Sequence, residues 1–575
     1  MDTDSRFFDE KEVIRELCKA RINVAASRHE QLFLNNIRPG KSGAREVPFR
    51  GPLDLDRLFP PRRLWHAFRL RWRRNKNGIP RASTDVNVDT LFRAVMVLRQ
   101  RMPDASWVSE LNNAVARILR RTFDEPSFEF SAPEIVPAPK NPAQHEYRPL
   151  AQYPLEDKII DCLTARYLRE SLDSLLTPAC LAFRCRTPDR PAPTIHDALH
   201  KLICLNRRHR KTGLFVAECD IKGFYDCVSH DVALGAVQRL ISEHGAQNHG
   251  AIHPRAVIIF KAYLRSYAFS EDVSKGRGRQ TLLKKDPQGQ YKWHREALQV
   301  LHATTLLPRI GVPQGGALSC FIANAVLHEA DLALRQLARR KKKALSYMRY
   351  CDDMILLCAD SDFCKEAFET YQTVVGGLKL PIHPPKVPPC YQDRETRHQF
   401  YDGKSNAPYH WHAPDKGGYP WIQFVGYQLR FDGLIRIRRK SVRKEQDKIC
   451  TAADELIARL RHKNGEPIRC TLGQIVHRFR MKLISMAVGR ASLGYSVSPA
   501  LPMCWAHGFR GLRGRSFIDS TLKMLDRCRE HQIARVKADL KKLTLPTETH
   551  VDEKLRVLPY YARPFSYWGQ FFPHP

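Results

Sequence analysis

Two adjacent aspartates mark the clearest chemistry in this sequence. Asp352 and Asp353 end the tetrapeptide YCDD and stand directly before the apolar run 354–358. Two carboxylates side by side at the turn of a β-hairpin repel each other unless cations bridge them. A metal site is the simplest resolution of that repulsion. Because an Asp-Asp pair is also a common turn sequence, the assignment depends on a third acid elsewhere in the chain.

Asp220 supplies the third acid. It stands near the end of the strand-like stretch 214–221, in which apolar residues dominate. In-line phosphoryl transfer needs metal ions at both the attacking and the leaving oxygen, which takes two or three carboxylates from separate strands. Asp220 and Asp352 meet that demand, so the residues predict a two-metal site for phosphoryl transfer. Asp226 follows the strand and is interpreted as a helix-capping residue.

The elements that position these acids follow from the spacing of apolar residues. Apolar side chains three and four residues apart predict helices at 10–33, 90–102, 155–176, 317–338, 441–461, 473–488 and 515–543. Apolar runs predict strands at 214–221 and 354–358. The Pro-rich passage 131–142 is predicted to be an extended loop that opens a new subdomain.

The chain is strongly basic. Lys and Arg number 94 against 60 Asp and Glu, which gives a formal net charge of +34. Four basic clusters lie at 69–74, 207–211, 339–343 and 436–439. Together they suggest a long groove for nucleic acid, with Trp65 and Trp72 available for base stacking or for core packing. The alternative is a basic enzyme without a polyanionic partner.

The cysteines and the hydropathy indicate a reducing compartment. The 16 cysteines form no C-x-x-C pair and stand in apolar contexts, which favours reduced core thiols over zinc ligands or disulfides. No stretch approaches 18 uncharged apolar residues, and the first ten residues are acidic and polar. We therefore expect a cytoplasmic protein without a signal peptide or a membrane span.

The motifs, taken in order, resemble those of reverse transcriptases. The segments that resemble motifs A, B, C and D and the primer grip are DIKGFYDCVSH at 220–230, GVPQGGALSCFIANAVLHEAD at 311–331, YCDD at 350–353, LKLPIHPPK at 378–386 and FVGY at 424–427. The segments that resemble the fingers motif and the short stretch ending in Phe-Arg are PAPKNPAQHEYRPL at 137–150 and CLAFR at 180–184. Seven motifs in the family's order are far more specific than any one of them.

The resemblance implies an α+β fold of the right-hand polymerase type, with an antiparallel palm sheet flanked by helices. Residues 131–440 would form fingers and palm, 441–575 a helical, thumb-like domain, and 1–130 a helical N-terminal region. The activity implied is RNA-directed DNA polymerisation from dNTPs on an RNA template, with a DNA product. Two Mg²⁺ ions, for which Mn²⁺ can substitute, would be the cofactors.

The resemblance also assigns roles to single residues. Metal binding falls to the carboxylates of Asp220, Asp352 and Asp353 and to the backbone carbonyl of Ile221. The nucleotide-binding residues would be Lys140 and Arg148 at the triphosphate, Tyr225 as the steric gate against a 2′-hydroxyl, Gln314 with Gly315 and Gly316 at the nascent base pair, and Lys386 at the leaving pyrophosphate. The primer grip would be Phe424, Val425, Gly426 and Tyr427. Tyr225 could also be a core aromatic, and Lys386 a surface lysine.

Two insertions and one substitution depart from the family pattern. Cys351 replaces the alanine or methionine more usual in motif C, and insertions fill about 245–300 and 384–423 without an obvious chemical motif. Residues 62–81 resemble the N-terminal helix and basic turn of bacterial group II intron enzymes. Neither a Cys/His endonuclease nor a second carboxylate set is evident in the sequence. The best placement is a bacterial reverse transcriptase of the defence-associated, abortive-infection or unknown-group kind.

Three functions remain open from the sequence. The first is RNA-directed DNA synthesis in antiphage defence, on a dedicated non-coding RNA and with a partner protein or a second copy of the chain. The second is template-independent or protein-primed synthesis, because its metal chemistry would be identical. The third is an RNA-binding, maturase-like role, in which the basic surface stabilises a folded RNA.

Overall fold

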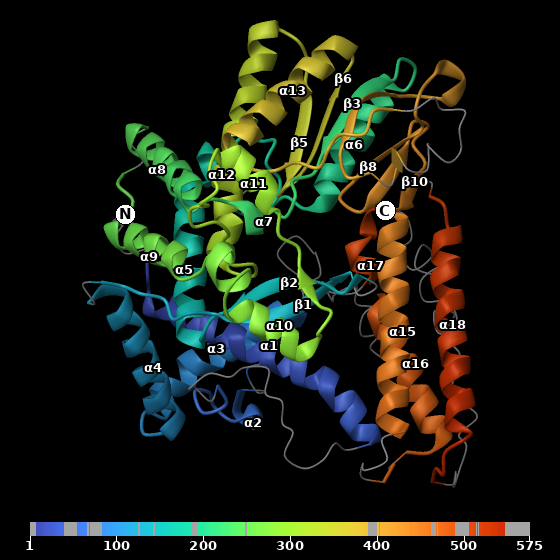
Figure 1. The fold of residues 1–575 in the computed structure, drawn as a ribbon. Coiled ribbons are helices and arrows are strands. Elements are labelled where there is room, and N and C mark those ends of the chain that lie inside the picture. Colours follow the sequence, from blue (N-terminus) through green and yellow to red (C-terminus); the bar gives the residue numbers. More distant parts are fainter. Residues whose placement is uncertain are drawn as a thin grey trace. The chain divides into compact units, whose positions relative to one another are not determined.

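A computed structural model places most of the chain (Figure 1). The residues it describes are 7–38, 55–65, 68, 83–124, 127–141, 144–185, 192–247, 250–388, 400–401, 403–461, 467–468, 470–488, 505–512, 515 and 517–546. The basic cluster at 69–74, Trp72 and most of the intron-like passage 62–81 lie outside these residues.

By internal packing the chain divides into two units. Unit 1 comprises Met1–Glu16, Asn112–Val425 and Arg430–Asp432, and unit 2 comprises Leu17–Leu111, Gly426–Leu429 and Gly433–Pro575. This grouping by packing differs from the predicted division at residues 130 and 440, since helices from both ends of the chain share unit 2, and that division into fingers, palm and thumb stays a prediction.

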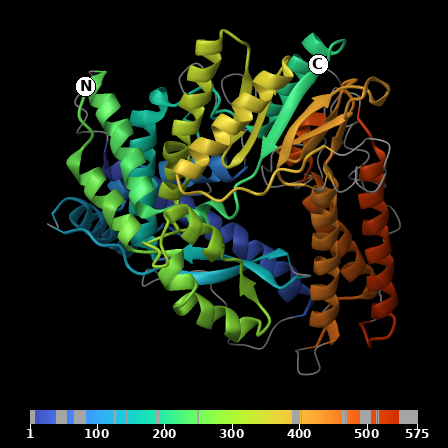
Figure 2. The same ribbon diagram turned by 45° about the horizontal axis from the view of Figure 1, so that its top comes forward.

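The palm sheet of unit 1 has four strands in the order β5-β6-β3-β7, and each neighbouring pair is antiparallel. The strands are β5 Ser346–Tyr350, β6 Asp353–Cys358, β3 Leu214–Cys219 and β7 Asn406–Trp411. Helix α13, Ser361–Gly377, packs along β3, β6 and β7, and α12, Ala317–Lys341, packs on α13 (Figure 1 and Figure 2). The two central strands are buried almost throughout because helices cover this sheet.

A second, smaller sheet in unit 1 corrects one prediction. Strands β1 Glu134–Asn141, β2 Glu146–Gln152 and β4 Gln290–Tyr291 lie in the order β1-β2-β4. The Pro-rich passage 131–142, predicted as a loop, therefore contains a strand. It tolerates its prolines because β1 lies at the edge of the sheet, where one side needs no N–H donors. Strand β4 comes from the first insertion and pairs in parallel with β2.

Helices surround the two sheets of unit 1. They are α5 Leu155–Leu172, the 3₁₀ turn η4 Asp173–Leu175, α6 Ile195–His209, α7 Phe224–Cys227, α8 His230–Ala246, α9 Pro254–Arg265, the π-helical turn η5 Phe269–Val273, α10 Arg277–Lys285 and α11 Arg295–His302. The 3₁₀ turn η6 Pro414–Lys416 and strand β8 Trp421–Phe424 come from the second insertion and its end. The predicted helices at 155–176 and 317–338 are confirmed. In the described part of the chain only α12 is long and apolar enough to cross a membrane, and 72% of its most apolar window is buried among neighbouring elements.

Unit 2 is largely helical. Its helices are α2 Arg62–Trp65, α3 Ser83–Arg101, α15 Arg439–Arg461, α16 Leu472–Val488, α17 Trp505–Gly508, η7 Arg510–Leu512 and α18 Ser520–Leu540; α1 Glu10–Ile37 and α4 Ser106–Phe123 each have residues in both units. Strands β9 Tyr427–Arg430 and β10 Ile435–Ile437 form an antiparallel pair. Helices α15, α16 and α18 lie side by side, as Figure 1 shows. The predicted helices at 10–33, 90–102, 441–461, 473–488 and 515–543 are confirmed as α1, α3, α15, α16 and α18.

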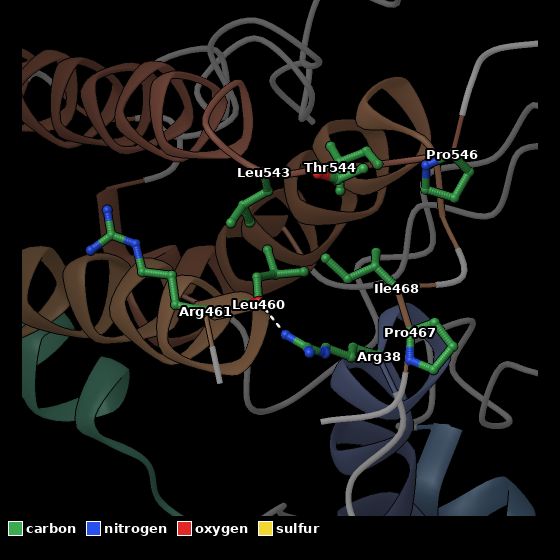
Figure 3. Close-up of a pocket in the computed structure, with 9 residues that line it drawn as sticks. Arg38, Leu460, Arg461, Pro467, Ile468, Leu543, Thr544 and Pro546 are labelled. Carbon is green, nitrogen blue, oxygen red and sulfur yellow. Dashed lines mark hydrogen bonds between the residues drawn. The ribbon is translucent and has the colours of Figure 1, made fainter. Parts of the chain in front are cut away.

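A pocket of about 510 Å³ lies at the ends of α15 and α18 in unit 2 (Figure 3). Its lining includes Leu460, Ile468 and Leu543. Arg38, beyond the end of α1, donates a hydrogen bond to the Leu460 carbonyl, and Arg459 Nε donates to the Arg38 carbonyl at 3.0 Å. These bonds tie the N-terminal helix α1 to the C-terminal helix α15.

Candidate active site

The three predicted aspartates lie at one end of the palm sheet. Tyr350 pairs with Asp353 across β5 and β6, so Cys351 and Asp352 form the two-residue turn of the predicted hairpin. Asp220 directly follows β3, and Cys219 of that strand pairs with Met354 at the start of β6. Because β3 and β6 are neighbours, the end of one and the start of the other bring the acids together.

The carboxylates of Asp220 and Asp352 are close enough for their charges to interact. Burial raises the pKa of Asp352, and the negative charge of Asp220 raises it further. Asp353 is exposed at the first position of β6. The Asp220 carboxylate already has one cation beside it, because Lys404 Nζ lies 3.2 Å from Asp220 Oδ2. The pair therefore carries an uncompensated charge that a further cation would stabilise.

The donor set fits a divalent metal ion. Carboxylate oxygens are the hard ligands that Mg²⁺ prefers, and Mg²⁺ is commonly held by one or two carboxylates together with substrate phosphates. Within the described residues, no group of three or more His, Cys, Asp and Glu side chains is arranged as a complete metal site. Asp220 and Asp352 would thus hold the metal from the protein side, with Asp353 next to them and phosphates filling the remaining positions.

A buried arginine, Arg349, holds the turn of the YCDD hairpin in place. Arg349 is fully buried, and its guanidinium donates to both carboxylate oxygens of Asp331, from Nε at 2.9 Å and from Nη2 at 2.7 Å. It also donates to the Cys351 carbonyl at 3.0 Å. Its backbone bonds to the carbonyl of Ala179 and to the amide of Leu181. The CLAFR segment therefore supports the hairpin that carries the acids, a role not foreseen from the sequence.

Tyr225 lies against the hairpin turn. Its hydroxyl is 3.3 Å from Cys351 Sγ, and its backbone carbonyl accepts a hydrogen bond from Val312 N–H at 2.8 Å. Burial strongly raises the pKa of Tyr225, so the phenol stays neutral. Cys351 itself has a left-handed backbone with a φ of 60°. The ring is thus fixed beside the hairpin turn that carries Asp352, and its role as a steric gate stays a prediction.

Gln314 is held by a residue whose role was predicted wrongly. Its Nε2 donates to Asp226 Oδ1 at 2.6 Å, and its carbonyl accepts from Ala151 N–H at 3.0 Å. Asp226 is buried within α7, whose N-cap is Gly223, so Asp226 is not a capping residue. Burial raises the pKa of Asp226 to about 7. Asp226 instead positions the amide of Gln314.

The two glycines after Gln314 are required for different reasons. Gly315 has a φ of 101°, a conformation that side chains rarely adopt. A Cβ atom on Gly316 would lie 1.8 Å from the hydroxyl oxygen of Tyr263. Asp161 of α5 then accepts hydrogen bonds from Ala317 N–H and from the next amide, at 2.7 and 2.9 Å. A side chain from another helix thereby caps α12 and fixes the turn before it.

The predicted phosphate-binding residues lie on two paired strands and on a separate segment of unit 1. Lys140 and Arg148 lie on the paired strands β1 and β2, and both are exposed. Lys386 is exposed as well, while its backbone bonds to the carbonyl of Ser405 at 3.0 Å. The lysine at the Asp220 carboxylate is Lys404, from the second insertion. Sequence reasoning did not find Lys404, because no motif marks it.

The predicted primer grip forms a tight turn. Phe424 ends β8, Tyr427 begins β9, and both side chains are buried. Val425 and Gly426 between them have φ values of 44° and 88°. The Tyr427 hydroxyl accepts a hydrogen bond from the Gly511 amide at 3.2 Å. The turn backbone, rather than the two aromatic rings, is therefore the part available to a ligand.

An antiparallel palm sheet with acids at neighbouring strand ends, together with a small fingers sheet, is the α+β fold of a right-hand polymerase. The family described as reverse transcriptase (RNA-dependent DNA polymerase) matches residues 138–428, half of the chain, and the protein belongs to this family. It is an RNA-directed DNA polymerase, a nucleotidyltransferase, and the family copies RNA templates with the help of divalent metal ions.

Solved telomerase structures are similar to this chain at low identity. Apo telomerase from Candida tropicalis has 10% identity and a TM-score of 0.34, over 79% of this chain and 75% of that chain. Telomerase from Candida tropicalis in complex with a TWJ fragment of telomeric RNA has 12% identity and a TM-score of 0.33, over 80% and 74%. The corresponding Candida albicans complex has 13% identity and a TM-score of 0.27, over 66% and 53%. No curated protein matches the sequence.

Proposed function

We propose that this reverse transcriptase copies RNA into DNA with two Mg²⁺ ions held by Asp220, Asp352 and Asp353 and by the carbonyl of Ile221. The observation that carries the proposal is that Asp220 and Asp352 lie at the ends of neighbouring strands. Burial raises the pKa of Asp352 most, and the negative charge of Asp220 raises it further. When bound, the two ions would stabilise the attacking 3′ oxygen and the leaving oxygen.

The remaining residues would bind and orient the nucleotide. Lys140 and Arg148, on paired strands, would neutralise charge on the triphosphate. Gln314, fixed by Asp226, would support the nascent base pair from the turn before α12. Lys386 would lie at the leaving pyrophosphate, and the turn at 424–427 would hold the primer end.

Tyr225 provides a test of sugar selection. We expect Tyr225→Ala to raise the efficiency of rNTP incorporation relative to dNTP by about 10- to 200-fold, because the ring would no longer occlude the 2′-hydroxyl. The measurement is kcat/KM for each nucleotide on one primed RNA. Tyr225→Phe, which keeps the ring and loses the contact with Cys351, should retain the preference for dNTPs. An unchanged ratio in Tyr225→Ala would make Tyr225 a core aromatic without this role.

Templated synthesis can be separated from its rivals by sequencing. The protein is purified with the nucleic acid it retains, given Mg²⁺ with labelled dNTPs or NTPs, and both the bound RNA and the product are sequenced. We expect DNA complementary to the bound RNA. A product unrelated to any RNA present would support template-independent or protein-primed synthesis instead. An RNA-loaded protein that makes no product would support the maturase-like role.

We further propose a role in bacterial antiphage defence, with a dedicated non-coding RNA as template. Its support is the resemblance of the motif set to defence-associated reverse transcriptases. The test is the plating efficiency of phages on a bacterial host that expresses the wild-type chain or Asp352→Asn. Protection by the wild type alone would support the role, and equal plating on both strains would refute it.

A further inference from the structure

The two insertions each add a strand to one of the two sheets of unit 1. The first contributes β4, which pairs with β2 next to Arg148, since Tyr147 is the partner of Tyr291. The second contributes β7, which pairs with β3 next to Asp220. The ends of these added strands therefore lie beside the residues proposed to bind the nucleotide.

The first insertion delivers a lysine and a histidine directly after β4. Lys292 Nζ is 3.5 Å from a carboxylate oxygen of Glu146 on β2. The ring of His294 lies over the turn that follows Asp220, because a Cβ atom on Gly223 would be 3.6 Å from His294 Cδ2. The insertion thus extends from the sheet β1-β2-β4 to the turn that follows Asp220.

The second insertion delivers Lys404 directly before β7. Lys404 Nζ is 3.2 Å from Asp220 Oδ2 and 3.0 Å from His383 Nε2. The next residue, Ser405, fixes the position of this lysine, because its Oγ accepts a hydrogen bond from Asp220 N–H at 3.0 Å. Lys404 is exposed, so its amine can exchange Asp220 for another anion without unfolding this anchor.

Positive charge accumulates where the two insertions meet. Burial lowers the pKa of His294 to about 4, and the charges of Lys222, Lys292, Lys140 and Lys404 lower it further. These four lysines therefore lie near the His294 imidazole, and they come from strand β1, from the turn after Asp220 and from the two insertions. Lys404 is paired with Asp220 and Lys292 with Glu146, while Lys140 and Lys222 add positive charge near His294, and such a cluster suits an anion with several charges close together.

We propose that Lys292 and Lys404 form a polyphosphate-binding subsite, which holds the β- and γ-phosphates of the incoming nucleotide and the pyrophosphate that leaves. The proposal rests on the proposed function of the Asp220 site and extends it to the two insertions. A polyphosphate concentrates its charge, whereas one strand of a duplex carries a single charge per about 3.4 Å of axis. The subsite therefore favours the nucleotide tail over the template backbone.

The test uses inorganic pyrophosphate as the probe. Binding is measured by calorimetry on the full chain without added metal, for the wild type, Lys292→Gln, Lys404→Gln and the double variant. We expect about tenfold weaker binding for each single variant, because each loses a charge-assisted hydrogen bond. Lys404→Arg should retain most of the affinity. The matched control is Lys416→Gln, an exposed lysine of the same insertion, which should bind like the wild type.

A second readout is kinetic. We expect the KM for dNTP to rise about tenfold in each single variant, with an unchanged affinity for primed RNA and an unchanged temperature of unfolding. Pyrophosphate affinity that is equal in the double variant and the wild type would overturn the subsite, even if polymerisation proceeds. A wild type that incorporates no nucleotide but binds pyrophosphate through these lysines would overturn the proposed function and leave the subsite standing. Loss of affinity for primed RNA alone would assign both lysines to the nucleic-acid backbone and refute the proposal.

Discussion

Asp352→Asn is expected to lower kcat/KM for nucleotide incorporation by about a thousandfold or more. The substitution removes one negative ligand while it keeps the size and the turn geometry of the side chain. The bound metal ions would stabilise the charge of the transition state by several kcal/mol, and the loss of that stabilisation corresponds to a rate loss of this order. The measurement is single-nucleotide incorporation on a primed RNA with Mg²⁺, and Asp220→Asn should behave in the same way.

Folding and a matched carboxylate provide the controls for this prediction. Asp352→Asn relieves the repulsion between two carboxylates, so its temperature of unfolding should equal or exceed that of the wild type. Asp362→Asn, at an exposed position on α13, should retain full activity. A folded Asp352→Asn protein with a tenth or more of the wild-type kcat/KM would contradict the metal-binding role of Asp352.

Local patterns explain why much of this site was predictable. The alternation of apolar runs and acids around Asp220 and Asp352 specifies strands that end in carboxylates, and the hairpin register follows from a two-residue turn. The motif predicts a glycine at position 316, but the sequence does not show why a side chain is excluded there. The Cβ atom of any other residue would clash with the hydroxyl of Tyr263, which belongs to another helix. The motif thus predicts the residue, while the contact that demands it is non-local.

The predictions that failed depended on tertiary neighbours. Prolines favoured a loop at 131–142, whereas pairing with β2 makes most of it an edge strand. Asp226 stands near a helix start in sequence, yet its carboxylate accepts from Gln314, far along the chain. Lys404 reaches Asp220 only because β7 joins the palm sheet, and no periodicity within 384–423 indicates that pairing.

The role of Arg349 also depends on a tertiary neighbour, and it affects the stability of the fold. The residue directly precedes YCDD, and in sequence it resembles any other cation of a basic chain. In the structure both members of its pair with Asp331 are fully buried. A buried ion pair contributes little net stability compared with apolar residues of the same volume, but loss of one partner leaves an unpaired charge in the core. The arginine therefore constrains the hairpin more strongly than its position in the sequence suggests.

Arg349→Met is accordingly expected to lower the free energy of unfolding by about 3–5 kcal/mol, because Asp331 would remain buried without its cation. The measurement is urea unfolding followed by circular dichroism. Adding Asp331→Leu should restore most of the loss, since the orphaned carboxylate is then gone. Arg339→Met, at an exposed position near the end of α12, is the matched control and should change stability little.

The double variant Arg349→Met with Asp331→Leu should still incorporate nucleotide more slowly than the wild type, because the Cys351 carbonyl has lost the donor that fixes the turn. A single variant as stable as the wild type would show that Asp331 takes its charge compensation from elsewhere, and the hairpin would then not depend on Arg349.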